Sequence, residues 1–181
     1  MSKIFATIKY ILILSILIIP VSSQAAGLFD SITKKKQTAV ELGGDAPDFS
    51  GEYFGTGEKV NYLKDLKGKV VLLDFWSIYC VSCLKEIPKL VEIYEKYKDK
   101  DVVFIYVDLD TNKRRLDMFR KKNNFNPVIM DKKRDIAKLF NVNILPTTLI
   151  IDKAGKLRFF HEGYKPGDEH EIEDIIQKLL N

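Results

Sequence analysis

A strand-length apolar run that ends just before a pair of cysteines constrains this chain more than any other feature. The run covers residues 69–76, and Cys80 and Cys83, the only cysteines in the sequence, follow it closely. The run predicts a buried strand, and a helix is expected to begin at the pair. At a helix N-terminus the dipole and the free amide groups favour the thiolate, the form that attacks disulfides. The arrangement therefore predicts a redox centre.

A structural disulfide is the alternative for this pair. An oxidising compartment turns paired cysteines into structural bridges. The loop that Cys80 and Cys83 would close, however, contains only Val81 and Ser82. Because the stabilisation from a disulfide grows with the logarithm of loop length, so short a loop gains little. The spacing favours redox chemistry over a structural role.

The bulk composition is that of a globular protein. At 181 residues with 46% hydrophobic residues, the chain is long enough for one domain with a sizeable core. The formal net charge of +4 is too balanced to indicate a nucleic-acid partner.

The N-terminus has the pattern of a secretory signal peptide. Lys3 and Lys9 precede an apolar run over residues 10–21, and small residues follow up to Ala26. The run is shorter than the roughly 20 residues of a spanning helix. We therefore predict a cleaved signal over residues 1–26, with an uncleaved membrane anchor as the alternative. Both place the protein outside the cytoplasm, and we expect it in the periplasm.

The rest of the chain divides into a linker and one folded domain. Residues 27–42 contain a lysine run and little apolar periodicity, which predicts a solvated linker. Residues 43–181 form the predicted domain, and alternating strands and helices in it favour an α/β fold with a parallel core. The expected elements are an edge hairpin within residues 49–61, strands over 69–76, 101–108, 127–130, 146–151 and 156–160, and helices from the cysteines, over 113–122, 134–140 and 168–180.

Three segments together resemble a known family. They are residues 75–88 around the cysteines, Leu145-Pro146-Thr147-Thr148, and Ala46-Pro47-Asp48-Phe49. They resemble the exported TlpA/ResA branch of thioredoxin-like proteins over roughly residues 43–180. The resemblance implies a thioredoxin-like fold: a central mixed sheet flanked by helices, with an N-terminal β-hairpin and a central αβ insertion. This chain departs from the family at Tyr79, where Trp is frequent, and at Val81-Ser82, where many members have Pro.

Two thiols and two acids are the predicted catalytic residues. Cys80, at the exposed helix start, is expected to attack, and Cys83, one turn further in, to resolve the mixed disulfide. Asp74 interrupts the apolar strand, so burial should raise its pKa, and the resemblance aligns it with the proton-transferring acid of thioredoxins. The resemblance also implies a functional carboxylate at Glu86. The alternatives are a structural aspartate for Asp74 and a solvated helix charge for Glu86.

Four residues are predicted to bind the substrate. Pro146 matches the family's cis proline, and with Leu145 it would expose a backbone edge that pairs with an extended substrate. A trans proline at a strand start is the alternative. Trp76 and Tyr79 are expected to flank the disulfide as an apolar docking surface, although either could fill the core instead.

A metal site is not expected. His161 and His170 together with the cysteines could hold copper or zinc. Copper-delivery relatives with this fold, however, use a Cys-x-x-x-Cys spacing, and structural zinc usually has four protein ligands. The segment before Cys80 also lacks the Pro-x-x-x-Thr-x-x-Cys pattern of peroxiredoxins. We predict no cofactor other than the Cys80/Cys83 disulfide.

These features predict an exported thiol-disulfide oxidoreductase, with reduction as the favoured direction. The resemblance implies cysteine-containing extracytoplasmic substrates, such as apocytochrome c or metal-site cysteines, and a membrane-bound thiol electron donor. A monomer is expected. The alternatives are a disulfide-forming oxidase and a copper-binding chaperone that uses the same cysteines.

Overall fold

A computed structural model describes residues 40–125 and 127–181. The predicted signal peptide and nearly all of the predicted linker lie outside these residues. None of the helices in the described residues is long and apolar enough to cross a membrane.

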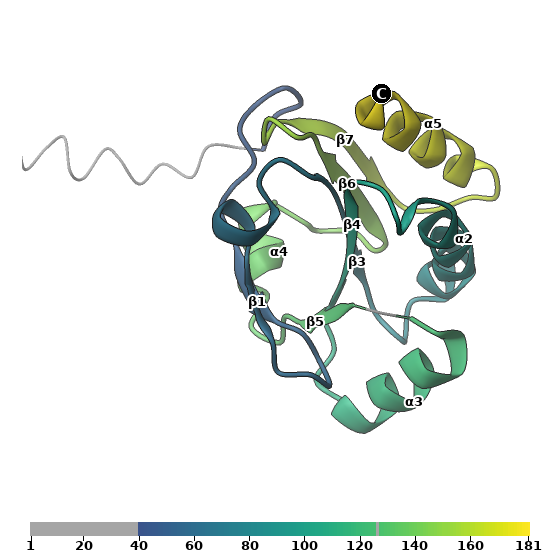
Figure 1. Cartoon of the computed structure of the whole chain (residues 1–181). Coiled ribbons are helices and arrows are strands. Elements are labelled where there is room, and N and C mark those ends of the chain that lie inside the picture. Colours follow the sequence, from purple (N-terminus) through teal and green to yellow (C-terminus); the bar gives the residue numbers. More distant parts are fainter. Residues whose placement is uncertain (1–39, 126) are drawn as a thin grey trace, which may run out of the picture. The chain divides into compact units, whose positions relative to one another are not determined.

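A mixed five-stranded sheet forms the centre of the fold, with the strand order β5-β4-β3-β6-β7 (Figure 1). The strands β3, β4 and β5 are parallel, whereas β6 runs antiparallel to β3 and β7 antiparallel to β6. Their bounds are Val70–Trp76 for β3, Val102–Asp108 for β4, Val128–Met130 for β5, Thr147–Ile151 for β6 and Leu157–Glu162 for β7. The α/β class and the mixed sheet of a thioredoxin-like fold are confirmed.

The central strand β3 is buried along its whole length, as its nearly unbroken apolar sequence predicts. Side chains alternate between the two faces of the sheet, so Asp74 lies on the same face as Leu72 and Trp76. In the strand register, Asp74 lies opposite Tyr106 of β4 and Thr148 of β6. The one acid of the run is therefore flanked by two polar side chains.

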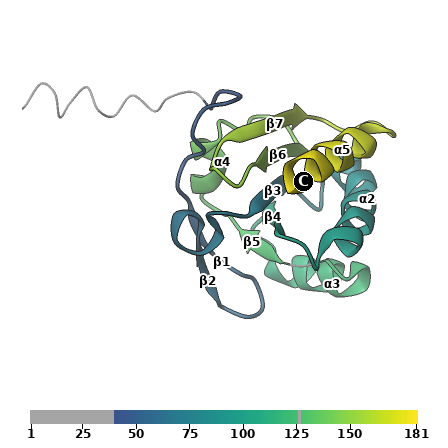
Figure 2. The same ribbon diagram turned by 45° about the horizontal axis from the view of Figure 1, so that its top comes forward.

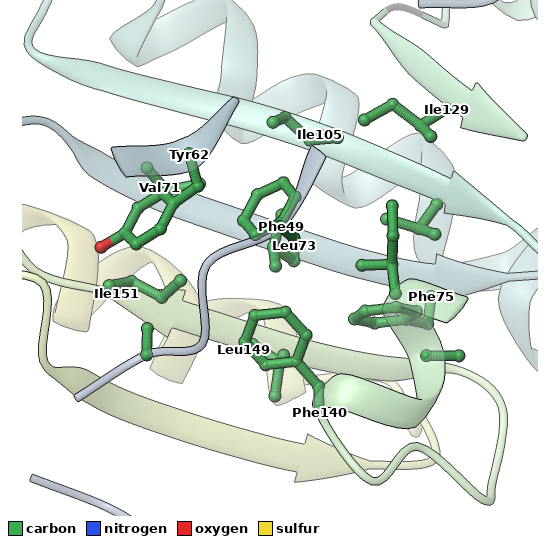
Figure 3. Packing of buried hydrophobic residues seen from close by; sticks show 14 of the residues in the cluster. Phe49, Tyr62, Val71, Leu73, Phe75, Ile105, Ile129, Phe140, Leu149 and Ile151 are labelled. Carbon is green, nitrogen blue, oxygen red and sulfur yellow. The ribbon is translucent and has the colours of Figure 1, made fainter. Parts of the chain in front are cut away.

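Three helices cover one face of the sheet, and a short helix together with the N-terminal segment covers the other. The helices α2 (Val81–Tyr97), α3 (Lys113–Asn123) and α5 (Asp168–Leu180) pack on the face that carries Leu72 and Trp76. The other face is covered by α4 (Asp135–Leu139) and by residues before β3, including Phe49 and Tyr62. Figure 2 shows this separation from a second direction, and Figure 3 shows the cluster around Phe49 and Phe140. The predicted central αβ insertion corresponds to the elements between β4 and β6.

The N-terminal hairpin forms a sheet of its own. Its strands β1 (Ser50–Glu52) and β2 (Lys59–Asn61) pair antiparallel, and one isolated bridge, Tyr53 to Ile129, connects the segment after β1 to the edge strand β5. A Cβ at Gly51 would lie 2.7 Å from Ile129 Cδ1, so glycine permits this close approach. A π-helical turn, η1 (Tyr62–Leu66), follows the hairpin and was not predicted.

Candidate active site

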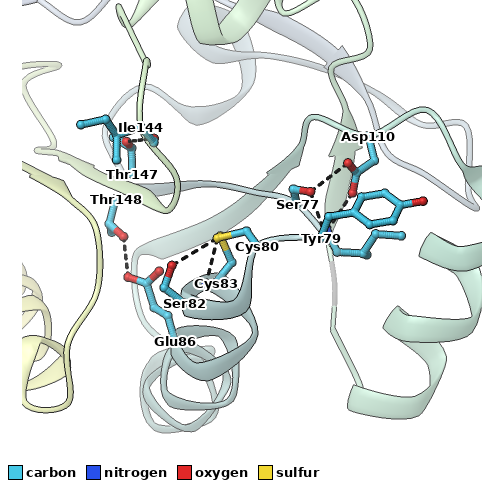
Figure 4. Close-up of a disulfide and its surroundings, with 11 residues drawn as sticks. Ser77, Tyr79, Cys80, Ser82, Cys83, Glu86, Asp110, Ile144, Thr147 and Thr148 are labelled. Atoms are coloured by element: carbon cyan, nitrogen blue, oxygen red, sulfur yellow. Dashed lines mark hydrogen bonds between the residues drawn. A yellow bond between two sulfur atoms is a disulfide. The ribbon is translucent and has the colours of Figure 1, made fainter.

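The cysteines form a disulfide at the start of α2 (Figure 4). Cys80 is the N-cap residue of the helix, and the backbone N–H of Cys83 donates to its sulfur at 3.1 Å. Cys80 is half-buried, whereas Cys83 is fully buried. An incoming sulfur can therefore reach Cys80 more readily than Cys83. After reduction, the amide and the helix N-terminus would favour the thiolate of Cys80.

Two further polar side chains shape the cysteine loop, and the sequence analysis missed both. The hydroxyl of Ser82 lies 3.3 Å from Cys80 Sγ, where it could donate to a thiolate. Asp110, just beyond β4, accepts from the Ser77 hydroxyl at 2.9 Å and from the Ile78 amide at 2.7 Å. Ser77 in turn accepts from the Tyr79 amide at 3.0 Å. The sequence did offer a signal for Asp110. It is a polar residue just after a predicted parallel strand, and functional side chains often lie at the carboxyl ends of such strands.

Asp74 lies in the interior on the α2 side of the sheet. Its side chain is fully buried, and neither carboxylate oxygen has a hydrogen-bond partner among the described residues. Burial, and to a smaller extent the charge of Glu86, raises its pKa well above the ordinary value. Since an unpartnered charge is costly in the interior, Asp74 favours the protonated form.

Glu86 is also fully buried, so the alternative of a solvated helix charge is wrong. The Thr148 hydroxyl donates to Glu86 Oε1 at 2.9 Å, and Oε2 has no partner among the described residues. Burial raises the pKa of Glu86 to about 7; the hydrogen bond from Thr148 lowers it, and the carboxylates of Asp168 and Glu169 raise it. A carboxyl with this pKa can give and take protons near neutral pH.

The segment before β6 lies beside this site. The Leu145–Pro146 peptide bond is cis, and the carbonyl of Pro146 accepts from the Gly163 amide at 2.7 Å. Leu145 packs against the buried hydrophobic side chains on both faces of the sheet, while Ile144 is 52% exposed. Because Thr147 pairs with Phe75, the start of β6 lies next to the end of β3, from which the cysteine loop departs.

The sequence of this chain is similar to those of a known protein family. Residues 42–160 match the model of the AhpC/TSA family. The thiol-disulfide oxidoreductase ResA of Bacillus thuringiensis subsp. konkukian is 37% identical over 145 residues, which cover 80% of this chain and 82% of that protein. The chain belongs to the AhpC/TSA family of thioredoxin-like proteins. The Cys80–Cys83 disulfide and the relatives named thiol-disulfide oxidoreductase ResA identify it as a thiol-disulfide oxidoreductase.

Solved structures share the fold of this AhpC/TSA-family protein. A putative thiol:disulfide interchange protein DsbE from Chlorobium tepidum superposes with a TM-score of 0.72 at 32% identity, covering 79% of this chain and 100% of that chain. The pneumococcal exposed lipoprotein thioredoxin from Streptococcus pneumoniae strain TIGR4 superposes with a TM-score of 0.61 at 28% identity, covering 74% of this chain and 100% of that chain. The resemblance to the TlpA/ResA branch is thereby confirmed.

Trp76 and Tyr79 have different environments in this family member. Trp76 is fully buried and packs against Phe119 and Phe125, at ring-centroid distances of 5.3 Å and 5.0 Å. The prediction that Trp76 forms a docking surface is therefore wrong, because α3 and the segment after it cover that position. Tyr79 is 61% exposed, and the Arg115 guanidinium lies 4.9 Å from its ring centroid.

The two histidines do not belong to a cluster of metal-ligating side chains within the described residues. His161 Nε2 is 3.0 Å from Asp168 Oδ2 at the start of α5. Within residues 40–125 and 127–181, no group of three or more His, Cys, Asp or Glu side chains is placed to hold a metal ion.

Proposed function

We propose that this thiol-disulfide oxidoreductase acts outside the cytoplasm and reduces disulfides of cysteine-containing proteins. The observation that carries the proposal is the placement of a half-buried Cys80 in front of a buried Cys83, with the buried acids Asp74 and Glu86 on the same side of the sheet. When ionised, Glu86 opposes a thiolate at Cys83. A reduced form that is disfavoured in this way gives up its electrons more readily.

The reaction begins with the reduced enzyme. The Cys80 thiolate attacks one sulfur of the substrate disulfide, a mixed disulfide forms, and the first substrate sulfur leaves as a thiolate. Cys83 then attacks Cys80 Sγ while its proton passes to a carboxylate, for which Glu86 has the suitable pKa of about 7. The second substrate sulfur leaves, and two electrons have moved from the enzyme to the substrate. A dithiol donor must then reduce the Cys80–Cys83 disulfide.

The substrate is expected to bind in an extended conformation. The backbone around Leu145 and Pro146 would pair with it, and exposed Tyr79 would supply apolar contact. Apocytochrome c or metal-site cysteines are the substrates that the ResA resemblance favours. A membrane-bound thiol protein would supply electrons, and we expect the enzyme to act as a monomer.

Two observations support an extracytoplasmic location. The first 26 residues have the charge and hydropathy pattern of a signal peptide. The pneumococcal neighbour, 28% identical, is named as an exposed lipoprotein. Processing of the N-terminus in cells that express the full chain, determined by mass spectrometry, tests this part of the proposal.

Trapping the mixed disulfide tests the chemistry. In a Cys83→Ser variant the resolving thiol is missing, so a covalent adduct between Cys80 and a substrate cysteine should accumulate and be released by dithiothreitol. The matched Cys80→Ser variant should form little adduct, because its remaining thiol is buried. Adducts that form mainly with Cys80→Ser would reverse the two roles, and adducts with neither variant would contradict the proposed mechanism.

A further inference from the structure

The first turn of α3 carries positive charges, which are unfavourable at the N-terminal end of a helix. Lys113, Arg114 and Arg115 open the helix, all three are exposed, and the turn contains no acidic residue. The N-terminal end of a helix has a partial positive charge, so cations there destabilise the helix. None of the three side chains forms an ion pair within the described part of the chain.

The helix α5 of the same molecule follows the opposite pattern. Its first turn contains Asp168, Glu169 and Glu171. Asp168 accepts from the Lys165 amide at 2.9 Å, and Glu169 accepts from the Gly167 amide at 2.8 Å. These hydrogen bonds hold the turn that precedes the helix, and the acidic charges complement the helix dipole. The cations of α3 do not stabilise the start of their helix in this way, so another reason for their presence is needed.

The topology brings the cationic turn to the disulfide. The strands β3 and β4 are parallel with Trp76 opposite Asp108, so the cysteine loop and α3 emerge at the same edge of the sheet. Arg115 makes the direct connection, because its guanidinium lies over the ring of Tyr79, the neighbour of Cys80. Figure 4 shows Tyr79 and Asp110 on the side of the disulfide away from Thr148.

The two acids nearest the surface at this turn, Asp117 and Asp110, already have partners, whereas Asp108 is fully buried. Asp117 of α3 pairs with Arg120 at 3.0 Å and with Lys121 at 2.7 Å. Asp110 accepts hydrogen bonds from Ser77 and Ile78. The exposed cations are therefore available to an outside partner. Tyr79, 61% exposed, lies against Arg115, and Val81, 69% exposed, adds apolar surface next to Cys80.

We propose that the surface formed by Tyr79, Arg114 and Arg115 binds an acidic segment of the substrate protein that adjoins the target disulfide. This inference rests on the proposed function and adds the substrate class of the same site. Guanidinium groups bind carboxylates through paired hydrogen bonds, and the exposed ring and Val81 accommodate the apolar parts of the segment. Charge complementarity of this kind mainly accelerates encounter and selects between partners.

The test uses two peptides that differ only in charge. Each contains one intramolecular disulfide, with two glutamates beside it in one peptide and two glutamines in the other. The reduced full-length protein is mixed with each peptide, the reaction is quenched with acid, and the second-order rate constant is determined by chromatography. We expect the glutamate peptide to react about two- to fivefold faster for each charge pair, with the difference falling as salt is added.

Matched variants identify the residues responsible. In the double variant Arg114→Gln/Arg115→Gln, the preference for the glutamate peptide should disappear. The control Lys122→Gln removes a cation from the other end of the same helix, about 12 Å away along its axis, and should keep the preference. Because the double variant removes cations from a helix N-terminus, it should fold at least as stably as the wild type.

A neutral small substrate, 2-hydroxyethyl disulfide, separates this inference from the proposed function. If the wild type reduces it but does not distinguish the two peptides, the substrate class is wrong and the oxidoreductase chemistry stands. A preference that persists in the double variant also overturns the assignment to Arg114 and Arg115. If the wild type reduces neither the small disulfide nor the peptides, the proposed function itself fails.

Discussion

Glu86 changes its protonation readily near neutral pH. It is buried, accepts one hydrogen bond from Thr148, and has a pKa of about 7. Asp74 has no hydrogen-bond partner among the described residues, and its pKa is raised well above the ordinary value by burial and by Glu86. We therefore assign the proton exchange that accompanies thiol chemistry to Glu86, with Asp74 as the acid that keeps its proton.

The raised pKa of Glu86 predicts how stability depends on pH. The ordinary value of 4.5 applies to the unfolded chain and the value of about 7 to the folded one, so the unfolded state releases its proton first. The stabilising effect of the protonated form is complete below pH 4.5 and is lost as the pH rises to about 7. The free energy of unfolding should fall in this window by up to about 1.4 kcal/mol per pH unit from this group.

The variant Glu86→Gln cannot ionise and should show a smaller fall of the unfolding free energy in urea titrations across the same window. The slope that is left would come from Asp74 and from Asp108, because burial raises the pKa of Asp74 and raises that of Asp108 to about 7. The control Glu58→Gln changes an exposed glutamate and should match the wild type. Equal slopes for the wild type and Glu86→Gln would contradict the assignment.

At the scale of elements, the short loop between β3 and α2 positions the attacking sulfur. Its conformation depends on one side chain from a neighbouring strand connection, because Asp110 accepts from both Ser77 and Ile78. Loops that carry reactive groups need such anchors, since their own backbone groups are not paired in a sheet or helix.

Removing the anchor should loosen the loop. In Asp110→Ala, the Ile78 amide and the Ser77 hydroxyl lose their acceptor, which should cost about 1–3 kcal/mol of stability. Hydrogen exchange at the Ile78 amide should accelerate, and attack by Cys80 on a model disulfide should slow. The control Asp99→Ala removes an exposed acid just after the C-terminal end of α2 and should leave both quantities unchanged. Unchanged exchange at Ile78 in Asp110→Ala would show that the loop is held by other contacts.

Elements with a strong pattern could be predicted from the sequence, and elements without one could not. The strands β3 and β4 are apolar runs, and α5 has a clear apolar stripe. The turn η1 has only five residues, too few to establish a period. The hairpin lies against β5 through the close contact of Gly51 with Ile129, which sequence patterns do not specify.

The same distinction holds within the site. Asp74 could be found because it interrupts an apolar strand, and Glu86 because the family resemblance implies a carboxylate at that position. Thr148 required the register of β6 against β3, and Asp110 required the path of the chain after β4. Trp76 was misjudged because adjacency to the cysteines in sequence was taken as adjacency at the surface, whereas its side chain points to the face that α3 covers.

At the scale of the whole molecule, the fold explains why the protein exchanges thiols and disulfides. It does not by itself determine whether the protein reduces or oxidises its substrates. The sheet brings the disulfide, the acids and the Leu145–Pro146 segment to neighbouring strand ends, an arrangement that suits both reduction and oxidation of substrates. The direction depends on how strongly the protein stabilises the reduced pair. The buried Glu86 carboxylate, which opposes thiolate formation, favours reduction of the substrate, whereas the helix N-terminus and Ser82 act in the opposite sense.

The reduction potential of the Cys80–Cys83 couple tests the central claim most directly. The full chain would be equilibrated with thiol buffers of graded potential, and free thiols would be trapped by alkylation and counted by mass spectrometry. A reductase should have a potential near that of thioredoxin, about −270 mV, whereas a disulfide-forming oxidase should lie near that of DsbA, about −120 mV. We predict a value near the thioredoxin end, and a value near the DsbA end would contradict the proposed direction of electron transfer.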